Sequence, residues 1–167
     1  MAALSEFFYA DHKRLERLLS RAGEGKIEQP LYDEFRAGLL RHIAMEERNV
    51  LPAIVEAKGG KPLLTARRVR FEHAALESLL IPPPSAGILR TLRTVLFQHH
   101  LLEDGPGGIY ESCEQLLGSL SDEVLRECRE IPETPPPPNN VDPAAIDMAC
   151  RALERAGFEV REEDLRS

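Results

Sequence analysis

The chain of 167 residues contains no tryptophan and only three cysteines, Cys113, Cys128 and Cys150. The cysteines are odd in number and lack the C-x-x-C spacing that is typical of zinc or redox motifs. We therefore expect free thiols in a reducing, cytoplasmic environment. The amino-terminal residues lack a basic segment followed by a long apolar run, so the sequence predicts no secretory signal.

Positive charge is also scarce, with 21 Lys and Arg against 28 Asp and Glu and a net charge of -7 at pH 7. Binding of nucleic acid requires a basic protein face, so we expect no nucleic-acid partner. No run of about 18 uncharged apolar residues occurs, which excludes a membrane-spanning helix. Sustained alternation of apolar and polar residues, the pattern of a half-buried strand, is also missing. These absences favour a soluble, helical protein with one main domain.

Apolar residues recur every three or four positions along most of the chain, which is typical of amphipathic helices. Four long helices are predicted, over residues 5–21, 30–58, 62–81 and 86–104. Ser5 can act as the N-cap of the first helix. Pro52 should bend or locally loosen the second helix, because proline cannot donate a backbone hydrogen bond.

Short loops between such helices favour antiparallel neighbours, so we predict an all-α fold built on an up-down-up-down four-helix bundle over residues 1–130. The glycine-rich segment 105–108 interrupts the fourth helix, which we expect to continue beyond it with a kink. A short helix is predicted over residues 122–129. Residues 131–141 are proline-rich and predict an extended linker. Residues 142–167 then predict a C-terminal helical tail.

One pattern, a histidine followed four residues later by a glutamate, occurs once on each of the four long helices. The pairs are His12–Glu16, His42–Glu46, His73–Glu77 and His99–Glu103. On an α-helix this spacing places both side chains on one face. The histidines fall on the apolar stripes, and a buried carboxylate without a cation is strongly destabilising. The pattern therefore predicts a buried metal site.

The two halves of the bundle resemble each other in sequence. Residues 8–19 align with residues 69–80, sharing an acid, the histidine, a leucine, the glutamate and a Leu-Leu pair. Residues 42–47 align with residues 99–104 in the same way. Pseudo-twofold symmetry would bring the ligands of both halves to the same depth in the bundle. We therefore expect two metal ions, one per half, with carboxylates between them.

The predicted metal ligands are His12, His42, Glu46, His73, Glu77, His99 and Glu103. An alternative remains open for Glu77 and for Glu16, because each lies beside the apolar stripe and could equally be a surface acid. For Glu77 neither use is favoured. For Glu16 the surface use is favoured, because Lys13 and Arg17 lie close by on the same helix.

Two further residues lie next to these ligands in the sequence. His100 is rotated about 100° round the helix from His99, so we expect it on the surface. Asp104 could replace Glu103 if the glycine-rich segment changes the helical register. Imidazole and carboxylate ligands without thiolates suit iron, manganese or zinc. About five to seven protein ligands for two metals leave open positions, which favours a reactive site over a structural one.

As a set, these motifs and the run Glu46–Pro52 resemble the hemerythrin family, specifically its single-domain HHE cation-binding branch. The resemblance covers about residues 5–120. It implies two iron ions, with manganese or zinc as substitutes. By this resemblance, one iron would be bound by His12 and His42 and the other by His73 and His99, with Glu46 and Glu103 bridging.

Where oxygen-carrying hemerythrins place a further histidine one turn after the third-helix histidine, this chain has Glu77, which argues against reversible oxygen transport. We therefore expect a cytoplasmic non-haem di-iron protein that binds or senses dioxygen or a related small oxidant, such as a diatomic molecule or peroxide. One alternative is a di-iron enzyme that detoxifies peroxide or nitric oxide or repairs iron centres. Another is an iron-dependent regulatory module that presents its C-terminal helix to an unknown protein partner.

Overall fold

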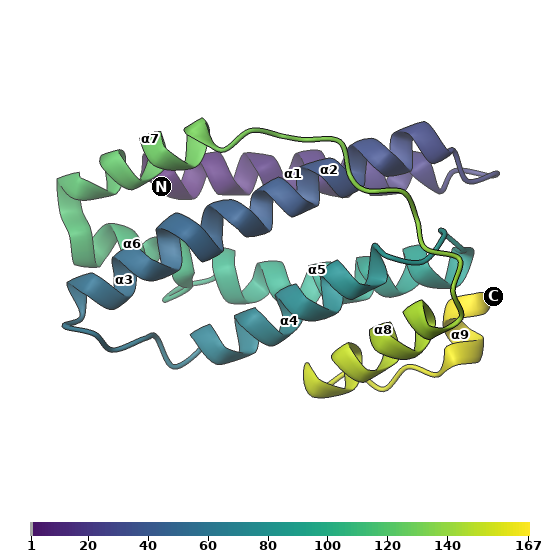
Figure 1. The fold of residues 1–167 in the computed structure, drawn as a ribbon. Helices are drawn as coiled ribbons and strands as arrows, with labels where there is room; N and C mark the ends of the chain where they lie inside the picture. The colour runs from purple at the N-terminus through teal and green to yellow at the C-terminus, as the bar shows by residue number, and fades with distance from the viewer. Residues whose placement is uncertain (1) are drawn as a thin grey trace.

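The computed structural model describes residues 2–167, and all regular secondary structure in that part of the chain is helical (Figure 1). The long helices are α1 (Ala3–Ala22), α2 (Gln29–Met45), α4 (Ala66–Leu79) and α5 (Ala86–Asp104). The shorter elements are the π-helical turn η1 (Glu46–Val50), α3 (Leu51–Ala57), α6 (Ile109–Leu117), the 3₁₀ turn η2 (Gly118–Leu120), α7 (Ser121–Glu130), α8 (Ala144–Arg155) and α9 (Glu162–Arg166). The all-α prediction is confirmed. None of the helices described is both long enough and apolar enough to cross a membrane.

The four long helices pack around a common interior, with α1 against α2 and α5, and α4 against α5. Two apolar clusters fill that interior. The larger cluster includes Leu15, Leu39, Leu76, Leu92 and Leu96. The smaller cluster includes Phe8, Met45, Val69, Ile109, Tyr110 and Cys113. In α1, His12 lies between Phe8 of the smaller cluster and Leu15 of the larger one. A polar layer therefore lies between the two apolar clusters at the level of His12.

The second long helix changes its geometry at the predicted ligand Glu46. A π-helical turn begins there and α3 follows directly, so α2 and α3 form a nearly continuous rod (Figure 1). Pro52 in the first turn of α3 has no backbone N–H for an α-helical bond to the carbonyl of Arg48, which fits a locally widened turn. The prediction that Pro52 loosens this helix is confirmed.

Two local predictions are wrong. The first helix begins two residues before Ser5, and no side chain caps it. The backbone N–H and hydroxyl of Ser5 instead donate to the carboxylate of Glu114, at 2.8 and 2.7 Å. The expected kinked continuation of α5 is also absent, because Gly105 adopts an extended conformation (φ -71°, ψ 165°) that ends the helix. A separate helix, α6, then begins at Ile109.

The proline-rich linker crosses the bundle from α7 to α8 without regular secondary structure (Figure 1). Side chains of α2 hold it in place. Arg41 Nε donates to the Ile131 carbonyl at 2.6 Å, and Arg36 Nη2 donates to the Pro137 carbonyl at 2.8 Å. Asn139 of the linker donates to the Pro82 carbonyl at 2.9 Å. The linker is therefore attached along its length.

The C-terminal tail packs against the bundle, with α8 against α4 and α9 against α5. Its apolar side chains, among them Ile146, Ala149, Leu153 and Leu165, belong to the larger apolar cluster. The tail lies at the opposite end of the molecule from α6 and α7 (Figure 1). The helix α9 was not predicted as a separate element, because a five-residue helix gives almost no periodic signal.

Gly87 in the first turn of α5 allows this close packing, and its replacement should disrupt it. The N–H of Gly87 donates to the Ser167 carbonyl at 2.9 Å, and a Cβ here would overlap the backbone carbonyl of Asp164. We expect Gly87→Ala to displace α9 and to lower the free energy of unfolding by about 1–3 kcal/mol, as overpacking does. Denaturant unfolding measures this difference.

Gly38→Ala in α2 is the matched control. A Cβ at Gly38 would approach the guanidinium of Arg14 and a methyl group of the buried Leu15, but no backbone atom. Because side chains can shift more easily than backbone and alanine is the better helix former, this variant should lose clearly less stability than Gly87→Ala. Equal destabilisation by the two substitutions would contradict the account of Gly87.

Candidate metal centre

Six buried side chains from the long helices and η1 converge between the two apolar clusters. We call them the histidine–carboxylate cluster: His12, His42, Glu46, His73, His99 and Glu103. They form two groups, and the ligand atoms of each group lie within 4.8 Å of one another. The first group is His12, His42 and Glu103, and the second is Glu46, His73, His99 and Glu103. Each group could hold a metal ion, and Glu103 belongs to both.

All four imidazoles direct Nε2 toward the interior of the cluster. In the first group, His12 Nε2 lies 3.1 Å from His42 Nε2 and 3.2 Å from Glu103 Oε2. In the second group, His73 Nε2 lies 3.0 Å from Glu46 Oε2. His99 Nε2 lies 2.7 Å from Glu103 Oε1 in the same group. Nitrogen and oxygen ligands therefore face one another across short gaps.

Two atoms of the second group indicate whether a metal ion fits the site. His99 Nε2 and Glu103 Oε1 are buried and have no hydrogen-bond partner, although they lie only 2.7 Å apart. Buried polar atoms are nearly always paired, so such atoms need an explanation. A cation bound by both would satisfy them, and a donor set of imidazole and carboxylate suits first-row transition metals. The residues fit a metal ion.

A second layer of acids lies behind the imidazoles, because the Nδ1 atom of each ligand histidine is hydrogen-bonded to a carboxylate. These outer carboxylates pair as His12 with Asp104 (2.7 Å), His42 with Asp11 (2.8 Å), His73 with Glu47 (2.7 Å) and His99 with Glu72 (2.9 Å). Such a carboxylate accepts the Nδ1–H, fixes the ring orientation and leaves Nε2 free to bind a metal.

Three of the outer carboxylates are themselves held by an arginine on the protein surface. Arg14 Nε donates to Asp11 at 2.8 Å, Arg68 Nε to Glu72 at 2.9 Å and Arg70 Nε to Glu47 at 3.2 Å. The arginine positions its carboxylate, and the carboxylate positions its imidazole. This arrangement is pre-organised in the way that a metal site requires.

Burial and neighbouring charges set the pKa values in the cluster. Although burial lowers the pKa of His73, its hydrogen bonds to Glu46 and Glu47 raise that pKa to about 9. Burial likewise opposes protonation of His99, but Glu103 raises the pKa of His99 to about 10. Burial and the nearby Glu46 carboxylate raise the pKa of Glu103. Without a metal, protons therefore stabilise the cluster, and a bound metal would displace them.

His100 is not on the surface, so that prediction is wrong. Its side chain is buried and stacks on His12, with ring centroids 3.7 Å apart and the planes at 8°. The flank of α5 that carries His100 is covered by α1, which helical rotation alone could not reveal. His100 Nδ1 lies 3.1 Å from Glu16, which also accepts from Lys13 and lies outside both groups.

Asp104 and Glu77, the other acids considered as ligands, lie outside the histidine–carboxylate cluster. Asp104, considered as a replacement for Glu103, lies behind His12 as an outer carboxylate, whereas Glu103 belongs to both groups. Glu77 belongs to neither group and is exposed on α4. It lines a cavity of about 520 Å³ together with Glu47 and Arg48. The structure therefore brings together six of the seven predicted ligands.

Tyr110 is a residue of the site that the sequence analysis missed. Its hydroxyl donates to Glu46 Oε1 at 2.5 Å and lies 3.1 Å from His12 Nε2, so it contacts both groups. The ring stacks on Phe8, with centroids 4.4 Å apart. Tyr110 comes from α6, outside the four long helices, and no His-x-x-x-Glu spacing involves it. Its only signal is a polar group on the apolar stripe of a short helix.

Comparisons with protein families, with curated proteins and with solved structures gave no match to this chain. The fold and the site define an all-helical protein whose buried histidines and glutamates could hold a metal ion. Function is therefore inferred from the chemistry of the site.

Proposed function

We propose that this chain is a hemerythrin-like four-helix-bundle protein that binds two iron ions and binds or senses dioxygen or a related small oxidant. The main support is the convergence of four imidazoles on two carboxylates, with each ring oriented by an outer carboxylate. The histidine pairs of the two groups are those that the family resemblance implies, but Glu103 alone belongs to both groups, whereas Glu46 belongs only to the second. Six protein ligands for two ions leave coordination positions open for a small molecule.

The residues of the chain would each have a definite role in this function. Iron, when bound, supplies the redox chemistry that small oxidants require. The shared carboxylate of Glu103 would hold two cations close together, and Glu46 would contribute from the second group. The apolar clusters on both sides limit the contact of the histidine–carboxylate cluster with water. Tyr110 would hold a proton at its hydroxyl, between the two groups.

Anaerobic loading with Fe²⁺, followed by metal analysis, tests this proposal. We expect two iron ions per chain and an optical spectrum that changes on exposure to air. Glu77→Gln, which alters an acid outside both groups, should bind the same amount of iron and is the control. Failure of the wild-type protein to retain iron or another transition metal would refute the proposal.

A second candidate is a di-iron enzyme that reduces peroxide or nitric oxide, and the position of Tyr110 favours it. Burial and the neighbouring carboxylates raise the pKa of its hydroxyl, which keeps its proton in the centre of the cluster and would donate a hydrogen bond to a bound substrate whose reduction consumes protons. Turnover by the iron-loaded protein with an added electron donor, above that of a His42→Ala variant under the same conditions, would support this candidate. No turnover of either substrate would refute it.

The third expectation, a regulatory module with a free C-terminal helix, has less support. Leu153 and Leu165 are buried in the larger apolar cluster, so the tail would have to leave the bundle to meet a partner. Equal protease sensitivity of residues 132–167 with and without metal would remove this alternative.

A further inference from the structure

The histidine–carboxylate cluster is buried, so a metal ion must pass through the outer layer of the protein to reach it. Two cavities extend to residues of the cluster or to its outer carboxylates. The first, which we call the acidic cavity, has a volume of about 570 Å³ and includes Glu103 and Tyr110 in its wall. The second, the mixed-charge cavity, has a volume of about 520 Å³ and includes Glu47 and Glu77.

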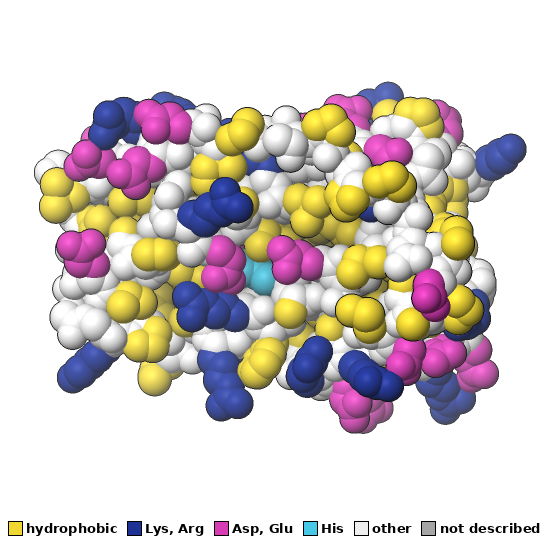
Figure 2. All heavy atoms as spheres, in the orientation of Figure 1, with side chains coloured by type: hydrophobic (Ala, Val, Ile, Leu, Met, Phe, Trp, Pro, Cys, Tyr) yellow, Lys and Arg dark blue, Asp and Glu magenta, His cyan; other side chains and the backbone are white. Residues whose placement is uncertain are grey.

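The two cavities differ in charge. Four acids and no lysine or arginine line the acidic cavity, namely Glu103, Asp104, Glu111 and Glu114. Arg41 and Arg48 line the mixed-charge cavity beside its two glutamates. On the face seen in Figure 2, one histidine side chain is visible between two acidic side chains, with basic side chains close by. A cleft of one charge sign concentrates ions of the opposite sign, so a cation should favour the acidic cavity.

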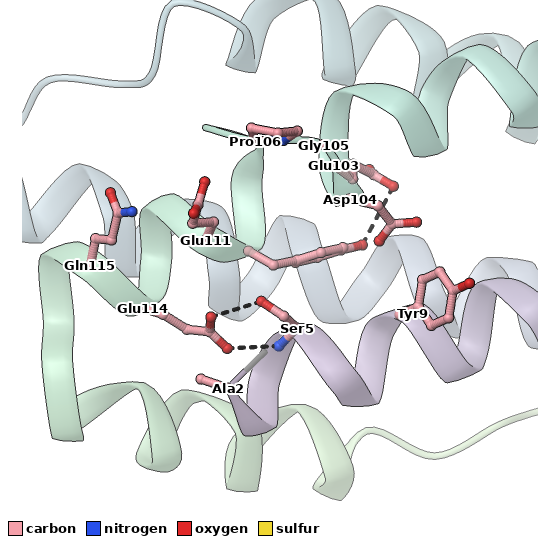
Figure 3. Close-up of a pocket in the computed structure, with 11 residues that line it drawn as sticks. Ala2, Ser5, Tyr9, Glu103, Asp104, Gly105, Pro106, Glu111, Glu114 and Gln115 are labelled. Carbon is pink, nitrogen blue, oxygen red and sulfur yellow. Dashed lines mark hydrogen bonds between the residues drawn. The ribbon is translucent and has the colours of Figure 1, made fainter.

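The acids of this cavity are held in place by neighbouring groups. Glu114 accepts from Ser5 of α1, and Figure 3 shows this pair on one side of the cavity. Glu111 accepts the backbone N–H of Gly107 in the loop that follows α5. A Cβ at Gly108 would overlap the carbonyl oxygen of Glu103, so this loop lies directly against the end of α5. The glycine-rich segment thus shapes the wall of the cavity.

A second observation points to a cation. Glu103 lines the cavity, is 1 % exposed, and its Oε1 has no hydrogen-bond partner. Asp104 lies beside it in the same wall, with a side chain 24 % exposed (Figure 3). Carboxylates therefore extend from the surface to a buried oxygen that has no hydrogen-bond partner and lies 2.7 Å from His99 Nε2.

We propose that the acidic cavity is the port through which a hydrated divalent metal ion reaches the histidine–carboxylate cluster. This inference rests on the proposed metal-binding function. Glu111 and Glu114 raise the local concentration of cations at the mouth. Asp104 replaces part of the hydration shell of the ion, and Glu103 takes the ion into the cluster.

The rate of Co²⁺ uptake by the metal-free, full-length protein tests this port. The absorption spectrum of bound Co²⁺ follows loading in a stopped-flow instrument. Glu111→Lys replaces an acid at the mouth that belongs to neither metal-binding group. We expect uptake to slow about tenfold or more, as steering by charge predicts, while the final stoichiometry is unchanged. Higher salt should slow the wild type more than the variant.

Glu77→Lys in the mixed-charge cavity is the matched control and should load within about twofold of the wild-type rate, because its charge lies outside the proposed path. Gln115→Lys also adds charge at the acidic mouth without touching the loop, and should slow loading if Glu111→Lys does not fold. Equal rates with full binding, or slower loading only in Glu77→Lys, would overturn the port alone. No Co²⁺ binding by the wild type would overturn the proposed function as well.

Discussion

Glu103→Ala is expected to weaken metal binding strongly at both positions of the cluster. Glu103 is the one residue shared by the two groups, and its carboxylate lies 3.2 Å from His12 Nε2 and 2.7 Å from His99 Nε2. Its loss removes a ligand from each ion and the negative charge that holds the two cations close together. We expect affinity to fall by about 100-fold or more at each position, equivalent to about 2.8 kcal/mol. Metal titration with equilibrium dialysis measures the change.

Unfolding experiments give an independent measurement of the same effect. A ligand that binds only the folded protein at about 100 times its dissociation constant adds about 2.7 kcal/mol to the free energy of unfolding. Wild-type protein, with two such sites, should show about twice this increase with excess metal, and Glu103→Ala should show only a small fraction of it. Glu77→Ala is the control and should behave as the wild type. Loss of only one metal ion from Glu103→Ala would contradict a shared role for this carboxylate.

The sequence could predict the inner ligands because they follow helical periodicity. A histidine and a glutamate four residues apart lie on one face of a helix, and the apolar stripes predict that the faces with His42 and Glu46 and with His99 and Glu103 point to the interior. Glu77 has the same spacing from His73 but is exposed. The i,i+4 spacing shows only that two side chains point to nearly the same side of a helix. Whether that side is buried depends on the neighbouring helices.

The outer carboxylates could not be predicted, because each contact that orients a ligand crosses between helices. Asp11 precedes His12 in the sequence but holds His42, and Glu72 precedes His73 but holds His99. The internal repeat aligns Asp11 with Glu72. In the structure these two acids contact His42 and His99, which the repeat also aligns with each other. The repeat therefore contained this symmetry, but only the packing of the helices reveals which ring each acid contacts.

Tyr110 and His100 were missed for a related reason. Tyr110 reaches the cluster from α6, a helix whose position depends on where the chain turns after Gly105. His100 is buried because α1 covers its side of α5 and allows the ring to stack on His12. Both depend on tertiary packing, whereas hydrophobic periodicity describes one helix at a time. The sequence therefore predicts the ligands that follow the periodicity of a single helix, but not the contacts that form between helices.

The twofold relation between the outer carboxylates leads to the second large expected effect, which separates the two metal positions. Asp11 orients His42 of the first group, and Glu72 orients His99 of the second. Loss of such an outer partner typically weakens metal binding about 10- to 100-fold. Asp11→Ala should therefore weaken only the first position, and Glu72→Ala only the second.

A two-site calorimetric titration with Zn²⁺ measures both affinities in one experiment. Each variant should keep one dissociation constant near its wild-type value while the other rises about 10- to 100-fold. Glu16→Ala is the matched control, because Glu16 contacts His100, which belongs to neither group, and it should leave both affinities unchanged. If Asp11→Ala and Glu72→Ala weaken both positions equally, the two groups act as a single site. The assignment of Asp11 to the first metal position and of Glu72 to the second would then be wrong.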